Sequence, residues 1–127
     1  MSKTVVVLWS SSTADMIQQQ NQRRLDTLLT SKNIDFIKID GSVPENKEKR
    51  DELFAISTTR GNYPQCFFEI DGTHEFVGVW EGEGGIETMA ECDDIPENIL
   101  TENPQIKTFK KVILSILSMA TKYQSFE

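Results

Sequence analysis

The N-terminal segment constrains the fold most, because an apolar run is followed at once by a short polar loop and a long amphipathic stretch. Val5 to Trp9 is continuous and rich in β-branched residues, which predicts a buried strand. Ser12 is the predicted N-cap of a helix that ends near residue 31, with Asp15 three residues on, as in a capping box. Another strand is expected over 34–39. Together these elements predict a right-handed parallel β-α-β unit.

The middle of the chain continues this alternation. Ser42 and Glu45 resemble a second capping box and predict a helix over 43–56, with proline in its first turn. The Asp71-Gly72 pair lies between two apolar runs, 65–70 and 73–79, and predicts a two-residue hairpin. A further helix is expected over 81–90, its start delayed by adjacent glycines. The order β-α-β-α-β-β-α predicts an α/β fold with a helix-covered mixed sheet.

The apolar residues of the first two helices predict which of their faces point inward. These residues are Ile17, Leu25, Leu28 and Leu29 in the first helix, and Leu53, Phe54 and Ile56 in the second.

The chain divides into residues 1–92, which carry this pattern, and residues 93–127. We expect an acidic, proline-containing connector over 93–104, and then an amphipathic helix capped near Asn103. The apolar stripe of that helix consists of Ile106, Phe109, Val112, Ile113, Ile116, Leu117 and Ala120. A short tethered helix docks on its own domain at little entropic cost, so we expect it to pack there. Dimerisation or insertion into a partner's groove is the alternative.

The net charge of −7 argues against binding to nucleic acid and to anionic membrane surfaces, since both reward basic patches. From Glu81 to Glu102 every charged residue is acidic. Such a run is usually a solvated face, and a docking surface for a basic partner is the alternative. No apolar run approaches the ~18 residues of a spanning helix, and no secretory signal is visible, so we expect a cytoplasmic protein.

The two cysteines, Cys66 and Cys92, have neither metal-ligand nor redox-pair spacing. His74 is the one histidine, which leaves a zinc site short of ligands. We therefore predict reduced, packed thiols and no metal site.

Several short motifs follow one another along residues 4–92. In sequence order they are Val7-Leu8-Trp9-Ser10-Ser11, the glutamine-rich stretch 18–22, Ile39-Asp40, Arg50-Asp51-Glu52-Leu53, Pro64-Gln65, Gly72, Gly78 and Trp80-Glu81. With the element order, they make the chain resemble the thioredoxin superfamily, glutaredoxins above all, and within it the SH3-domain-binding glutamic-acid-rich proteins. The resemblance implies a glutaredoxin-like domain over 1–92, a four-stranded mixed sheet with an extra C-terminal helix, and a cis peptide bond before Pro64.

The resemblance also places a redox corner at the start of the first helix, where Thr13 to Met16 stand in place of a Cys-x-x-Cys tetrad. A hydroxyl neither forms a disulfide nor ionises near neutral pH, so dithiol catalysis is not expected. The partner-binding groove that the resemblance implies consists of Ser10, Ser11, Ser12, Thr13, Tyr63, Pro64, Val79, Trp80 and Glu81.

The predicted function is that of a non-catalytic, glutaredoxin-like binding or adaptor protein that engages protein partners through this groove. A residual glutathione site, or an atypical thiol oxidoreductase that uses Cys66, is the alternative. An SH3-domain partner follows from the family resemblance. The chain, however, contains four prolines and no P-x-x-P repeat, which a polyproline ligand of an SH3 domain requires.

Overall fold

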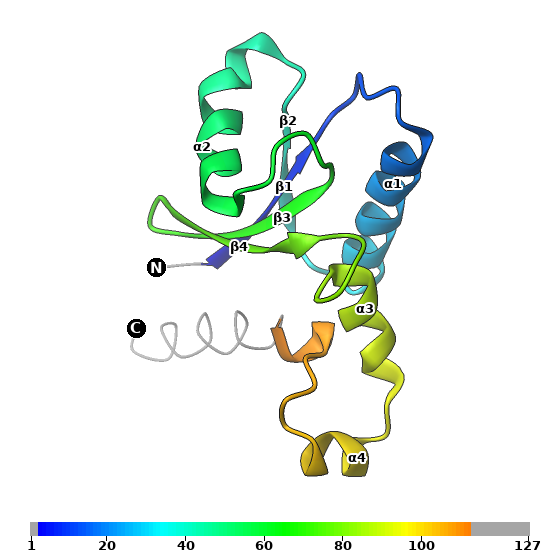
Figure 1. The fold of residues 1–127 in the computed structure, drawn as a ribbon. Coiled ribbons are helices and arrows are strands. Elements are labelled where there is room, and N and C mark those ends of the chain that lie inside the picture. The colour runs from blue at the N-terminus through cyan, green and yellow to red at the C-terminus, as the bar shows by residue number, and fades with distance from the viewer. Residues whose placement is uncertain (1–2, 113–127) are drawn as a thin grey trace.

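The computed structural model describes residues 3–112 (Figure 1). In chain order the elements are β1 (Lys3–Trp9), α1 (Met16–Ser31), β2 (Phe36–Asp40), the 3₁₀ turn η1 (Pro44–Asn46), α2 (Lys47–Ser57), β3 (Gln65–Ile70), β4 (Thr73–Val79), α3 (Ile86–Glu91), the 3₁₀ turn η2 (Cys92–Asp94) and α4 (Glu97–Glu102). A helical turn over 109–112 ends the described part of the chain.

The four strands form one mixed sheet in the order β2-β1-β3-β4. β1 pairs with β2 in parallel, and β3 is antiparallel to both β1 and β4. The parallel pair requires a crossover, which α1 supplies. The predicted mixed α/β sheet is therefore confirmed.

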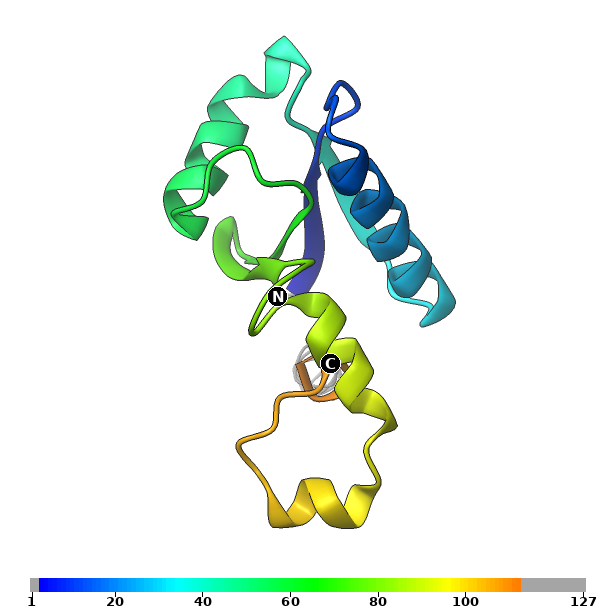
Figure 2. The same ribbon diagram turned by 45° about the vertical axis from the view of Figure 1, so that its right-hand side comes forward.

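Helices cover both faces of the sheet, with α1 and α2 on opposite sides (Figure 2). Because side chains alternate along a strand, β1 supplies Val5 and Val7 to the core under α1, and Val6 and Leu8 to the core under α2. Burial on both faces explains the unbroken apolar run. Ile56, by contrast, was predicted to face inward, and its side chain is 41% exposed on the outer side of α2.

The hairpin between β3 and β4 turns at Asp71-Gly72, as predicted. Both residues have positive φ, 51° for Asp71 and 79° for Gly72. Left-handed backbone at two consecutive turn positions matches the twist of the flanking strands, and asparagine, aspartate and glycine tolerate it best.

The two predicted capping serines do not cap helices. Asp15 is the N-cap of α1, and its Oδ1 accepts hydrogen bonds from the amides of Ile17 (2.9 Å) and Gln18 (3.1 Å). Ser42 instead donates its hydroxyl to the Asp40 carboxylate at 2.7 Å. The chain then enters η1 at Pro44, and α2 begins later than predicted. Ser12 contacts the Ser10 hydroxyl at 3.5 Å within its own loop, and Ser42 also contacts the Ser11 hydroxyl of the other loop at 3.0 Å.

The segment after α3 is more ordered than the predicted connector, since it contains η2 and α4. Asn103 is the C-cap of α4, and the last described helical turn is capped by Thr108, whose Oγ1 accepts from the Lys111 amide at 3.0 Å. Phe109 lies in the core under α1, where its side chain is 1% exposed. Ile113, Ile116, Leu117 and Ala120, which complete the predicted stripe, lie outside the described residues.

None of the helices within residues 3–112 has the length and apolarity needed to cross a membrane.

Candidate functional site

Three segments of the predicted groove meet at one end of the sheet. Leu8 pairs with Gln65, and Gln65 pairs with Val79, so the ends of β1 and β4 and the start of β3 lie side by side. The peptide bond between Tyr63 and Pro64 is cis, as the resemblance implied. In Figure 1 the serine loop and the loop before β3 lie toward the same end of the sheet, whereas the chain after β4 runs away from the serine loop to α3.

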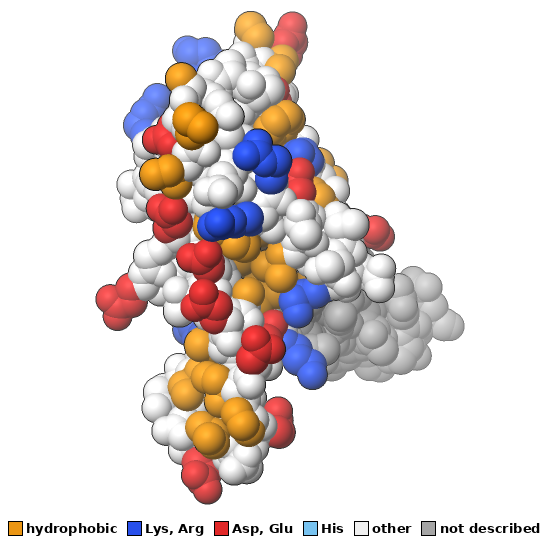
Figure 3. Space-filling model, turned by 90° about the vertical axis from the view of Figure 1, so that its right-hand side faces the viewer, with side chains coloured by type: hydrophobic (Ala, Val, Ile, Leu, Met, Phe, Trp, Pro, Cys, Tyr) orange, Lys and Arg blue, Asp and Glu red, His pale blue; other side chains and the backbone are white. Residues whose placement is uncertain are grey.

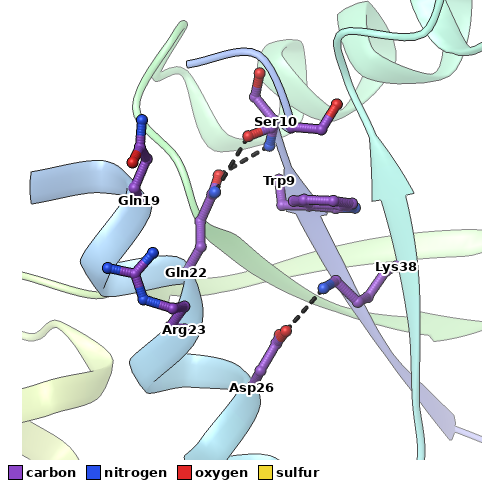
Figure 4. A pocket seen from close by; sticks show the side chains of 8 residues that line it. Trp9, Ser10, Gln19, Gln22, Arg23, Asp26 and Lys38 are labelled. Carbon is purple, nitrogen blue, oxygen red and sulfur yellow. Dashed lines mark hydrogen bonds and ion pairs between the residues drawn. The ribbon is translucent and has the colours of Figure 1, made fainter. Parts of the chain in front are cut away.

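The serine loop is fixed by side chains from α1 and β2. The Gln22 side-chain amide binds both polar groups of the Ser10 backbone: its Oε1 accepts from the amide at 2.8 Å, and its Nε2 donates to the carbonyl at 3.1 Å (Figure 4). On the other side, the hydroxyls of Ser11 and Ser42 lie 3.0 Å apart. Since its backbone is held from two sides, the loop is a preformed surface.

Asp40, at the end of β2, holds the serine loop on the side where Ser11 meets Ser42. Its Oδ1 accepts from the Ser11 amide (3.2 Å) and from the Ser42 amide (2.9 Å) and hydroxyl (2.7 Å). Desolvation by burial raises the pKa of this carboxyl, but the hydrogen bonds from Ser11 and Ser42 outweigh it and lower the pKa to about 2.

We expect Asp40→Asn to reduce the free energy of unfolding near neutral pH. The folded-state pKa lies below the ordinary 3.8, so this carboxylate stabilises the fold above about pH 4, and the contribution disappears as the pH falls toward 2. Solvent screening near the surface limits the effect to about 1 kcal/mol. Urea unfolding from pH 7 to pH 2.5 measures it. The variant should lose part of the acid dependence of stability, and an unchanged acid dependence would contradict the assignment.

Two large apolar side chains lie exposed beside the serine loop. Met16 is 80% exposed and Ile17 is 58% exposed, the two highest values for large hydrophobic residues among those described. The prediction that Ile17 faces the core is wrong, because α1 starts only at Met16 and the face of its first turn that carries Ile17 is left uncovered. The sequence signal that could have revealed this is Asp15, a strong N-cap that places both residues in the first turn.

The loop before β3 is attached to α1 through Gln18, the residue that follows this apolar pair. Gln18 Nε2 donates to the Gly61 carbonyl at 3.1 Å, and Gln18 Oε1 accepts from the Thr13 hydroxyl at 3.2 Å. One glutamine thus joins the serine loop, α1 and the 58–63 loop. We call residues 11–13, Met16, Ile17 and 60–63 the corner surface; Ser10, a predicted groove residue, is only 6% exposed and lies beneath it.

Tyr63 contributes the inner wall of the corner surface. Its ring packs against Phe54 with the ring centroids 5.9 Å apart, and the side chain is half-buried. Burial raises the pKa of the Tyr63 hydroxyl above its ordinary value, while nearby Arg50 acts in the opposite direction. The phenol therefore stays neutral at physiological pH. Pro64 lies fully buried beneath it.

The remaining predicted groove residues do not form one surface: Val79 lies in the strand ladder, Trp80 lies in the core, and Glu81 faces solvent. Val79 is half-buried in the β3–β4 ladder, and Glu81 is exposed. Trp80 is only 7% exposed and packs in the core under α1, so it is not a free aromatic wall of the corner. The charged side chains of the β4–α3 loop, Glu81 and Glu83, are both acidic.

The corner contains no thiol from the part of the chain that the structure describes. Cys66 lies inside β3, paired with Val7, and burial raises the pKa of its thiol to about 12. Cys92 is half-buried in η2, beyond α3. At the N-terminus of α1 the Asp15 carboxylate takes the two amide hydrogen bonds, and an anion at this position is favourable for the helix.

A polar pocket of about 410 Å³ lies beside the serine loop, between α1 and β2. In this pocket Lys38 is paired with Asp26 at 2.7 Å and lies 4.1 Å from the centre of the Trp9 ring (Figure 4). Lys38 and Asp26 thus neutralise each other, and Arg23, which also lines the pocket, is the remaining charged side chain. Within residues 3–112, no group of three or more His, Cys, Asp or Glu side chains is arranged to hold a metal ion.

Comparison with protein-family models, with curated proteins and with solved structures finds no match to this chain.

Proposed function

We propose that this protein is a non-catalytic binding or adaptor module that engages protein partners through the corner surface. The observation that carries the proposal is the consecutive exposed pair, Met16 and Ile17, beside a loop held rigid by Gln22 and Asp40. Exposed apolar side chains on a preformed surface favour association, because their burial is rewarded and little ordering entropy is lost.

We further propose that the scaffold is glutaredoxin-like, as in the SH3-domain-binding glutamic-acid-rich proteins, and that it works in the cytoplasm. The element order and the place of Pro64 directly before β3 support this relationship. The missing P-x-x-P repeat argues that a partner, SH3-containing or not, contacts the folded surface and not a polyproline segment.

Both alternatives have less support. A glutathione site would place a carboxylate at the β4–α3 loop, which carries Glu81 and Glu83 and so repels an anion. An oxidoreductase would need a thiolate, whereas a thiol with a pKa of about 12 is almost wholly protonated at neutral pH.

The experiment compares affinity purifications from native cells with two matched double variants. Met16→Gln with Ile17→Gln removes the apolar pair of the corner surface. Ile37→Gln with Ile56→Gln removes two other exposed apolar side chains, 52% and 41% exposed, and serves as the control. We expect the corner variant, and not the control, to recover at least tenfold less of the proteins that co-purify with the wild type. A tenfold loss of affinity corresponds to about 1.4 kcal/mol of binding free energy. Equal retention by both variants would contradict the proposal.

A turnover assay with glutathione and a mixed disulfide tests the enzymatic alternative directly. The expected rate equals the uncatalysed rate, since no thiolate is available at the corner. A measurable rate that disappears in Cys66→Ser would establish an oxidoreductase instead. Chemical shifts of the Tyr63 and Gln65 amides during a glutathione titration distinguish simple glutathione binding from both outcomes.

A further inference from the structure

A second surface, separate from the corner, is an open groove along the outer side of α1. The groove has a volume of about 560 Å³, and its floor is apolar where Leu28 and Trp80 line it. Figure 3 faces this side of the molecule and shows hydrophobic side chains in a hollow, with basic and acidic side chains around them. A hollow of this volume lies within the range of ligand sites, roughly 300–1,000 Å³.

Two arginines on α1 give the groove its positive charge. Arg23 is exposed and forms no ion pair within residues 3–112. Arg24 lies 3.7 Å from Glu87, with both side chains about half exposed, and a surface pair of this kind contributes little because solvent screens it. Both guanidinium groups are thus available to an incoming anion, and each offers planar donors that suit a carboxylate.

Trp80 adds a hydrogen-bond donor that lacks a partner. Its side chain lines the groove and is 7% exposed, and its Nε1 is buried with no acceptor among the described residues. A buried donor left unpaired costs free energy, because it has lost its hydrogen bonds to water. An oxygen acceptor brought into the groove, with a small movement of the covering side chains, would recover part of that cost.

We propose that this groove binds an acidic, partly apolar peptide segment of a partner protein. Carboxylates of the segment pair with Arg23 and Arg24, and its apolar side chains cover Leu28 and the Trp80 indole. Although the protein carries a net charge of −7, this groove is lined by Arg23, which has no ion pair within residues 3–112, and by Arg24, whose pair with Glu87 is exposed and weak. Complementary charge of this kind selects the partner and directs its approach.

The part of α1 that lines the groove sets the length of the segment. From Gln20 to Ser31 the helix rises about 17 Å at about 1.5 Å per residue. An extended peptide advances about 3.3 Å per residue, so roughly five residues span the groove. The probe is therefore a fluorescein-labelled peptide of about this length in which glutamate alternates with leucine and phenylalanine. A second peptide with lysine at each glutamate position is its charge-reversed control.

Fluorescence anisotropy measures the affinity, and the indole N–H resonances of ¹⁵N-labelled protein report the location. We expect a dissociation constant of about 100 μM or tighter for the acidic peptide, and a shift of the Trp80 indole resonance, assigned with Trp80→Phe. Arg23→Glu with Arg24→Glu should weaken binding at least tenfold. Lys47→Glu with Lys107→Glu makes the same change in net charge at exposed positions outside the groove and should retain the wild-type affinity.

Equal binding of the basic peptide, equal affinity of the two double variants, or an unmoved Trp80 resonance would each overturn the proposal. Self-association that Arg23→Glu with Arg24→Glu abolishes in analytical ultracentrifugation would also overturn it, since a second copy would then be the occupant. The groove and the corner surface share no residue, so failure here leaves the proposed function standing.

Discussion

Replacing Phe109 with alanine is expected to lower the free energy of unfolding by about 3–5 kcal/mol. The ring is 1% exposed and belongs to the same core as Val5, Leu25 and Ile86, which come from β1, α1 and α3. Removing the ring leaves a cavity, because the surrounding side chains are held by three different elements and cannot move far enough to fill it. Equilibrium urea unfolding, followed by far-ultraviolet circular dichroism, measures the loss.

This prediction tests whether the segment after α4 is part of the folded unit. Phe109→Leu keeps much of the apolar volume and should cost less than half as much as the alanine variant. Lys110→Ala alters the neighbouring exposed position and should change stability by less than about 0.5 kcal/mol. If Phe109→Ala were as stable as Lys110→Ala, the C-terminal segment would be an appendage and the core would end at α3.

Gly85→Ala should destabilise the protein by about 3 kcal/mol through a clash with the backbone. A Cβ at this position would lie 2.5 Å from the Glu81 carbonyl oxygen and 2.8 Å from the Trp80 carbonyl oxygen. Neither atom belongs to a flexible side chain, so the whole β4–α3 turn must move. That turn also holds the Glu87 amide against the Trp80 carbonyl at 3.0 Å, so its shift should loosen the start of α3.

Gly78→Ala is the matched control for this substitution. It lies in β4, its φ is not positive, and its added Cβ would be 3.6 Å from the nearest atom, an ordinary contact. We expect its stability to stay within about 1 kcal/mol of the wild type. Thermal unfolding gives the melting temperature of each variant. Equal melting temperatures for Gly85→Ala and wild type would show that the turn is not packed as described.

Much of the fold was predictable because its signals are local. The run from Val5 to Leu8 is apolar without interruption, since both faces of β1 are covered. The Asp71-Gly72 pair identified the hairpin because few residues tolerate two left-handed turn positions in succession. By contrast, α4 spans six residues with a weak helical pattern, and only its position after Pro96 marks it.

The site was predicted less well. Ser12 and Asp15 are both good N-cap residues, and the choice between them depends on contacts that the loop makes with Gln22 and Asp40, far away in sequence. That choice decides whether Ile17 lies in the first or the second turn of α1. An apolar residue such as Ile17 fits a helical stripe equally well whether or not another element covers it.

Local residue types are enough to specify the alternation of strands and helices, the turn at Asp71-Gly72 and the lack of cysteine at the start of α1. Each depends on the residue types of a short segment and on backbone preferences within it. Tertiary structure alone decided that Trp80 is buried while Met16 and Ile17 are exposed. The reason is that burial of an apolar side chain depends on where the ends of one element fall relative to another, and segments distant in sequence set that alignment.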